Sequence, residues 1–188
     1  MTQILALDIA GNPFRWLDIE RAAYYVAGGK VAWDLGESGL VLHGGRSRSA
    51  GIRSELVIKP VIALAKSDAM VRHHRDELPL GRDNTLLFRR DRNTCAYCGE
   101  RFDKRDLTRE HIFPRARGGA DVWANVVTAC RHCNERKACR TPEEARMPLL
   151  YVPYVPCRFE HFILTGRAIL VDQMDYLAAR LPGHSRVG

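Results

Sequence analysis

Short apolar runs, separated by turns that contain glycine or proline, dominate the first 65 residues of the 188-residue chain. Three of these runs have the length and composition of strands, at residues 3–9, 31–35 and 40–43. The Gly36-Glu-Ser-Gly39 segment predicts that the last two form a hairpin. A fourth run, residues 56–65, contains Pro60 and predicts an edge strand or two short strands, because proline lacks an amide hydrogen. Asp18 is placed to cap a helix over residues 19–26.

The rest of the chain mixes strand and helix patterns. Residues 107–113 and 121–128 predict two strands, and a helix over 130–139 follows them. Further helices are predicted at residues 84–90, 142–147, 159–164 and 168–181. The last helix has an apolar stripe that suits either core packing or a dimer interface.

These elements predict an α+β protein in three parts. Residues 1–81 form a small N-terminal α+β platform, and residues 82–147 form a module with its own chemistry. Residues 148–188 form a C-terminal helical extension, an extended segment followed by helices that pack on the rest. A monomer or a homodimer is consistent with this size.

The positive charge is concentrated in the middle of the chain. Residues 82–140 hold fourteen Lys or Arg against eight Asp or Glu, which is +6 of the total +7. A surface of this kind favours a polyanionic partner such as DNA.

No apolar run approaches the roughly 20 residues that a membrane-spanning helix needs, and no secretory signal opens the chain. We therefore expect a cytoplasmic protein, in which reduced thiols favour metal binding over a disulfide framework.

Two Cys-x-x-Cys pairs stand at Cys95 and Cys98 and at Cys130 and Cys133. Each pair supplies two thiolates with little backbone strain, and Zn²⁺ prefers four such ligands in a tetrahedron. The spacing therefore predicts one structural zinc site. The long gap between the pairs predicts that a second feature is built between them.

That feature is an acid–imidazole pair, Glu110-His111, with Asn134 and Lys137 after the second cysteine pair. Imidazole beside a carboxylate suits a general base, and carboxylate and amide oxygens suit Mg²⁺ or Mn²⁺. On a helix that starts at Cys130, Asn134 and Lys137 share a face, which we expect to turn toward the strand that carries His111. This set predicts metal-assisted phosphodiester hydrolysis.

A regular strand places Glu110 and His111 on opposite faces. For both to serve one site, the strand must end, twist or bulge at this point, and Pro114 just downstream favours an end.

The same residues resemble the HNH endonuclease motif in its zinc-stabilised ββα-metal form. The resemblance rests on Glu110-His111-x-x-Pro114, Gly118-Gly119, Asn125 and Cys130-x-x-Cys133-Asn134-x-x-Lys137. The segments on either side of the motif resemble those of stand-alone bacterial and phage HNH proteins. Glu110 stands where most members have Asp.

The resemblance implies that His111 is the general base and that Glu110 and Asn134 hold one catalytic divalent ion. It further implies that Asn125 braces the loop after His111 and that the products carry a 3′-hydroxyl and a 5′-phosphate. Lys137 is expected to add electrostatic support.

Phosphate contacts are expected from arginines on either side of the motif, because such contacts position a duplex without reading its sequence. The candidates are Arg89, Arg90, Arg92, Arg115, Arg117 and Arg136.

Two alternatives remain open. A zinc module that binds nucleic acid without cleaving it needs the cysteines and arginines but not Glu110, His111 and Asn134 together. The second alternative is a scaffold protein in which the nuclease motif is vestigial. His73 and His74 are expected to be exposed rather than to bind a second metal.

Overall fold

The computed structural model describes residues 2–46, 51–65 and 80–187. The described residues divide into two compact units. Residues 2–65 and 165–181 belong to the first unit, and residues 80–164 and 182–187 belong to the second. The C-terminal segment is therefore shared between the units. His73 and His74, and part of the loop expected at 44–51, lie outside the described residues.

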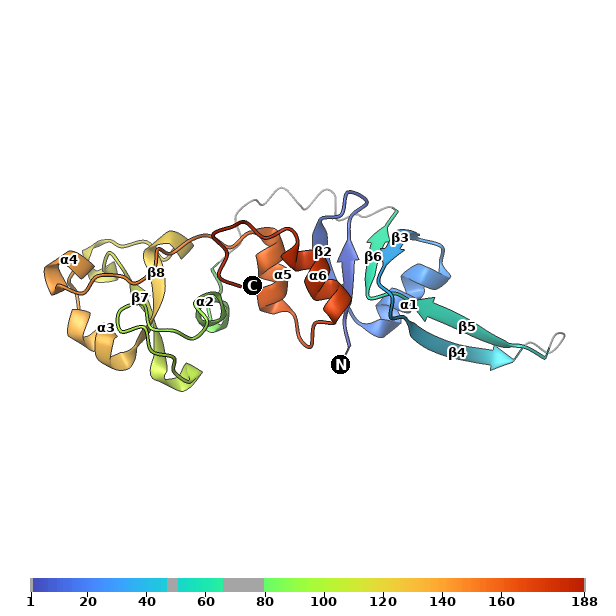
Figure 1. Ribbon diagram of the computed structural model, residues 1–188, viewed down its shortest axis with the longest axis horizontal. Coiled ribbons are helices and arrows are strands. Elements are labelled where there is room, and N and C mark those ends of the chain that lie inside the picture. The colour runs from blue at the N-terminus through green and yellow to red at the C-terminus, as the bar shows by residue number, and fades with distance from the viewer. Residues whose placement is uncertain (1, 47–50, 66–79, 188) are drawn as a thin grey trace. The chain divides into compact units, whose positions relative to one another are not determined.

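The first unit is built on a four-stranded sheet in the order β2-β1-β6-β3 (Figure 1). The strands are β1 (Ile4–Leu7), β2 (Pro13–Leu17), β3 (Val31–Leu35) and β6 (Val61–Leu64). Strands β1 and β6 run parallel, and the other pairs are antiparallel. Every residue of β1 and β6 is buried, as expected for central strands with no polar face.

Helix α1 (Ile19–Ala27) confirms the helix predicted after Asp18. The Asp18 carboxylate accepts a hydrogen bond from the Arg21 amide at 2.8 Å, which satisfies one of the free donors of the first turn. Ala22 is buried in a core cluster with residues of β1 and β6, such as Ile4 and Ile62. The small side chain lets the helix lie close to the strands.

The predicted hairpin is wrong, although both of its strands exist. Strand β3 pairs with β6, whereas β4 (Leu40–Arg46) pairs with β5 (Arg53–Ile58). Gly36, at φ +121°, directs the chain out of the sheet, where a Cβ would lie 2.7 Å from Pro60. The local glycines therefore mark a change of sheet rather than a tight turn.

Pro60 separates β5 from β6, so the prediction of two short strands is confirmed and that of an edge strand is wrong. Strand β6 is central because the proline lies before its first residue. The Pro60 carbonyl accepts hydrogen bonds from the Leu5 amide at 2.9 Å and from the Gln173 side chain at 2.8 Å. The proline thus lacks a donor but still contributes an acceptor to the sheet.

Helix α6 (Val171–Ala178) belongs to the first unit and buries Gln173, Tyr176 and Leu177. The Tyr176 hydroxyl donates to the Gly11 carbonyl at 2.7 Å. These contacts agree with core packing for this helix. They also explain why a segment so late in the sequence folds with the first strands.

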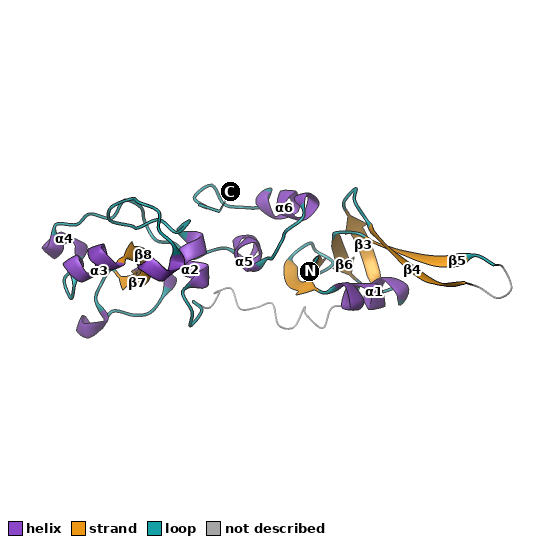
Figure 2. Ribbon diagram, turned by 90° about the horizontal axis from the view of Figure 1, so that it is seen from below, coloured by secondary structure: helices purple, strands orange, loops and turns teal. Residues whose placement is uncertain are grey.

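The second unit is centred on the antiparallel pair β7 (Leu107–His111) and β8 (Val126–Cys130). Helix α3 (Arg131–Lys137) follows β8 directly, and α2 (Thr85–Arg90) precedes the first cysteine pair. Figures 1 and 2 show α3 and α2 on opposite sides of the strand pair. The two faces of β7 therefore meet different helices.

Further elements complete this unit. They are η2 (Lys104–Asp106), η3 (Arg115–Arg117), η4 (Trp123–Asn125), α4 (Pro142–Ala145) and α5 (Arg158–Thr165). The strand predicted at 121–128 begins only at Val126, because Trp123–Asn125 forms a 3₁₀ turn that buries Trp123. Its indole packs in a cluster with Phe88 and Leu107.

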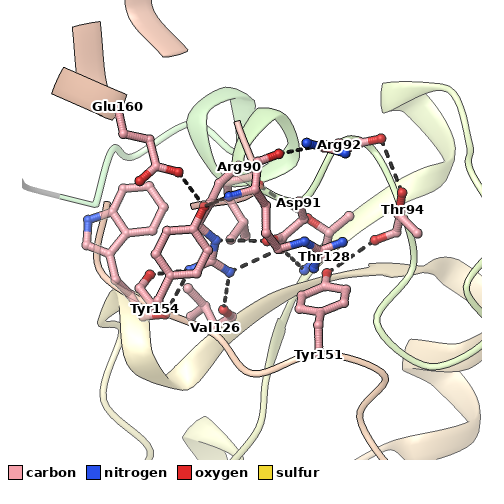
Figure 3. A network of polar contacts seen from close by, with 12 residues as sticks. Arg90, Asp91, Arg92, Thr94, Val126, Thr128, Tyr151, Tyr154 and Glu160 are labelled. Atoms are coloured by element: carbon pink, nitrogen blue, oxygen red, sulfur yellow. Dashed lines mark hydrogen bonds and ion pairs between the residues drawn. The ribbon is translucent and has the colours of Figure 1, made fainter. Parts of the chain in front are cut away.

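Arg90 is the centre of a buried polar network (Figure 3). It is 0% exposed and binds Asp91 with two hydrogen bonds, of 2.8 and 3.1 Å. It also donates to the carbonyls of Trp123, Val126 and Tyr154 at 2.8–3.0 Å. The expectation of a phosphate contact at Arg90 is therefore wrong, because all of its guanidinium is engaged in the core.

Asp91 extends this network to β8 by accepting the Thr128 amide at 2.8 Å. Asp91→Ala would leave the Arg90 charge buried without its partner, a defect that costs about 3–5 kcal/mol. We expect a loss of that size in the free energy of unfolding of the second unit, measured by urea denaturation. Asp103→Ala is the matched control, because Asp103 is exposed and its ion pair is worth about 1 kcal/mol at most. Equal effects of the two changes would contradict the prediction.

Candidate metal and catalytic site

The four cysteines of the two Cys-x-x-Cys pairs come together in the second unit. Their Sγ atoms all lie within 4.8 Å of one another. Four sulfurs at this separation can each reach one ion at the roughly 2.3 Å of a zinc–thiolate bond. The cluster therefore has the donors and the spacing of a closed four-thiolate metal site.

Local backbone structure brings each pair into place. Gly99, at φ +78°, closes the first turn and donates its amide to the Cys95 carbonyl at 3.0 Å. Cys130 occupies the N-cap of α3, and its sulfur accepts the Cys133 amide at 3.4 Å. Ala129, Ala145 and Met147 pack beside these cysteines. The site thus joins the first turn to the start of α3 within an apolar surround.

Strand β7 presents two different faces, since its pairing with β8 is regular from Leu107 to His111. Thr108 and Glu110 contact α3. Arg109 and His111 lie on the other face and contact Asp121. The expected separation of Glu110 from His111 is therefore present, and the strand ends at His111 without a bulge.

Glu110 is buried and forms an ion pair with Lys137, whose Nζ lies 2.5 Å from Oε1. The Lys137 side chain is fully buried, and its ammonium also donates to the His111 carbonyl at 2.9 Å. Burial raises the pKa of the Glu110 carboxyl above its ordinary value, while Lys137 acts in the opposite direction. The Lys137 ammonium thus connects the end of α3 to both Glu110 and the His111 backbone.

Asn134 is held in one orientation by Thr108. The Thr108 hydroxyl donates its only hydrogen to the Ala129 carbonyl at 3.0 Å. It can then only accept from Asn134, whose Nδ2 lies 2.8 Å away. The amide oxygen of Asn134 is therefore directed away from Thr108, on the β7 face that also carries Glu110.

His111 lies on the face of β7 toward α2, and its Nε2 is 2.9 Å from Oδ1 of Asp121. The other carboxylate oxygen of Asp121 accepts from Arg109 at 2.7 Å. Partial burial acts to raise the pKa of Asp121, but the hydrogen bonds from Arg109 and His111 hold it below its ordinary value. Sequence reasoning missed Asp121 because no spacing relates it to His111. The one signal in the sequence was that Arg109 and His111 alternate along the strand and so share a face, where both can bind the same acid.

Asn125 fixes the loop between β7 and β8. Its Oδ1 accepts the Phe113 amide at 2.9 Å, and its Nδ2 donates to the carbonyls of Phe113 and Ala120 at 3.1 and 2.8 Å. Gly119 approaches the same carbonyl so closely that a Cβ would lie 1.9 Å from the Phe113 oxygen. The two ends of the loop are thus bonded together beside His111.

The five remaining arginine candidates are exposed, but they differ in their contacts. Arg89 and Arg92 donate to the carbonyls of Leu164 and Arg186. Arg117 pairs with Glu144 at 2.6 Å and lies over the Phe113 ring. Arg115 and Arg136 present their side chains to solvent.

The comparisons with known proteins agree with this geometry. Residues 95–150 match the family model described as HNH endonuclease, a segment that holds the four cysteines, Glu110, His111, Asn125, Asn134 and Lys137. This part of the chain is an HNH endonuclease domain. A comparison with curated proteins gave no match. Among the described residues, no helix has the length and apolar character to span a membrane.

The cysteine cluster predicts a metal-dependent fold. We expect Cys133→Ser to lower the melting temperature of the second unit by about 10 °C or more, since structural zinc contributes much of the folding energy of such modules. Removal of metal by a strong chelator should have the same effect on the wild type. Cys139→Ser is the control, because Cys139 is exposed and outside the cluster. An unchanged melting temperature in Cys133→Ser, with no zinc detected by elemental analysis, would contradict this prediction.

The buried ion pair gives a second prediction for this site. Lys137→Met would leave the Glu110 carboxylate buried without its partner and should cost about 3–5 kcal/mol of unfolding free energy. Adding Glu110→Gln should recover part of that loss, because the neutral amide needs no counter-charge. Urea denaturation of the two single variants and the double variant measures the coupling. Strictly additive losses would show that the two side chains do not interact.

Proposed function

We propose that the chain is a metal-dependent endonuclease that hydrolyses DNA phosphodiester bonds. The HNH endonuclease match over residues 95–150 supports this class of reaction. The observation that carries the proposal is the position of Lys137, which pairs with the Glu110 carboxylate and donates to the His111 backbone carbonyl. Asn134 lies with Glu110 on the α3 face of β7, and the His111 side chain lies on the other face at the end of the same strand. A cytoplasmic location remains an expectation from the sequence.

The four cysteines are proposed to hold structural zinc, and Glu110 and Asn134 a catalytic Mg²⁺ or Mn²⁺. The donor set fits the catalytic ion, because a carboxylate and an amide oxygen are hard ligands. Lys137 contacts Oε1 of Glu110, and we assign Oε2 and the Asn134 amide oxygen to the ion. When bound, the ion supplies charge stabilisation to the phosphoryl oxygens.

His111 is the proposed general base. It is the last residue of β7, so its imidazole lies at the end of the strand pair. The scissile phosphodiester is proposed to bind at this end. The imidazole takes a proton from a water molecule as that water attacks the phosphorus. The bond to the 3′-oxygen breaks, and that oxygen takes a proton from solvent, which leaves a 5′-phosphate and a 3′-hydroxyl. The Asn125 brace holds the adjoining loop in place.

DNA binding is proposed for the basic surface of the second unit. Arg115 and Arg136 are the exposed arginines best placed for phosphate contacts. Arg117 can exchange its partner, because its surface ion pair with Glu144 is worth about 1 kcal/mol or less. To contact phosphate, Arg89 and Arg92 would have to break their hydrogen bonds to the carbonyls of Leu164 and Arg186.

A second candidate function is DNA binding without cleavage. The burial of Glu110 against Lys137 favours it, because that ammonium already neutralises the carboxylate expected to hold the catalytic ion. Cleavage assays separate the two candidates.

His111→Ala tests the proposal directly. Loss of the base should lower the rate of plasmid cleavage by about 10²–10⁴-fold, without change in the melting temperature or zinc content. The assay uses supercoiled plasmid with Mg²⁺ or Mn²⁺ and an EDTA control.

His43→Ala is the matched control, since His43 lies in the first unit in an exposed pair with Glu55. It should cleave at the wild-type rate. Metal-dependent cleavage that persists in His111→Ala would remove His111 from the mechanism. Wild-type protein that binds plasmid but never cuts it would favour the binding module.

A further inference from the structure

We infer that Asp121 is the positioning residue for His111, fixing which imidazole nitrogen faces the water. This inference deepens the proposed function and rests on it for its catalytic meaning. The HNH motif as read from the sequence contains no acidic partner for His111 on that face of β7.

The contact geometry defines the role. The Asp121 carboxylate lies 2.9 Å from Nε2 of His111, within hydrogen-bond range. An ionised carboxylate can only accept, so Nε2 must carry the proton that it donates. Nδ1 is then the nitrogen with a free lone pair. The structure thereby designates Nδ1 as the atom that takes a proton from water.

Asp121 is itself held by an anchored arginine. Arg109 donates to Oδ2 of Asp121 at 2.7 Å, and its side chain is only 12% exposed. The same guanidinium donates to the Asn84 side chain at 2.9 Å and to the Gly81 carbonyl at 2.6 Å. Because these partners precede or cap α2, Asp121 is fixed relative to that helix as well as to β7.

The chemistry follows from this arrangement. As the water attacks, its proton moves to Nδ1, and the imidazole becomes an imidazolium with a proton on each nitrogen. The Asp121 carboxylate stabilises that positive charge and stays unprotonated. A carboxylate in this relation to a histidine orients the ring and sets its tautomer.

Asp121→Asn should reverse the tautomer with little change in shape. Arg109 has no acceptor atom, so the amide oxygen of the new side chain must face Arg109. The amide nitrogen then faces His111 and donates to Nε2, which places the imidazole proton on Nδ1. Nδ1 then carries a proton and cannot accept one from water, although the imidazole ring is still present.

The experiment measures cleavage and the tautomer separately. We expect Asp121→Asn to lower kcat on supercoiled plasmid by about 10²–10⁴-fold, with KM unchanged. Asp121→Glu, which keeps a carboxylate, should recover part of the rate. Nitrogen NMR of the His111 ring should show the Nε2–H tautomer in the wild type and the Nδ1–H tautomer in Asp121→Asn.

Asp106→Asn is the matched control, because Asp106 is exposed and forms an ion pair with the exposed Arg105. Wild-type kcat in Asp121→Asn, or an Nδ1–H tautomer in the wild type, would overturn the inference. If the wild type does not cleave DNA, the proposed function fails, and the NMR tautomers alone decide the Asp121–His111 contact. Because the wild-type tautomer needs no variant, a poorly folded Asp121→Asn would not prevent the test.

Discussion

The buried Lys137 ammonium is the interaction on which the arrangement of this domain depends. It lies at the end of a helix whose start carries two cysteines of the metal cluster, and it binds both Glu110 and the His111 backbone. The helix is therefore fixed to the sulfur cluster at one end and to the motif strand at the other. A buried charge of this kind tolerates little displacement, because any loss of its partners leaves it unsolvated.

The regular pairing of β7 separates two tasks that the sequence places side by side. Its α3 face carries Glu110 and Thr108, and the latter orients Asn134. Its other face carries Arg109 and His111, which share Asp121. Groups suited to hold a cation and groups suited to move a proton are thus supported by different helices. A change in either helix is expected to disturb one task more than the other.

Much of the motif could be predicted from the sequence because its spacing is local. The metal cluster follows from the spacing of the two cysteine pairs, and the helix after Cys130 and the face shared by Asn134 and Lys137 follow from helical periodicity. Long-range partners were not predictable in this way. The hairpin expected after Val31 failed because β3 pairs with β6 instead. Arg90 looks like its exposed neighbours in the sequence, and only the fold shows it buried against Asp91.

The identity of the acid at position 110 gains meaning from its surroundings. Glu110 extends from the strand far enough to meet a lysine ammonium in the interior, at 2.5 Å. A shorter Asp would have to draw Lys137 closer to β7 or lose this contact. Lys137 is also bound to the His111 carbonyl, so its movement would disturb the end of the strand. The longer acid and the buried lysine are therefore best regarded as one unit, in which Oε1 of the carboxylate is bound within the fold.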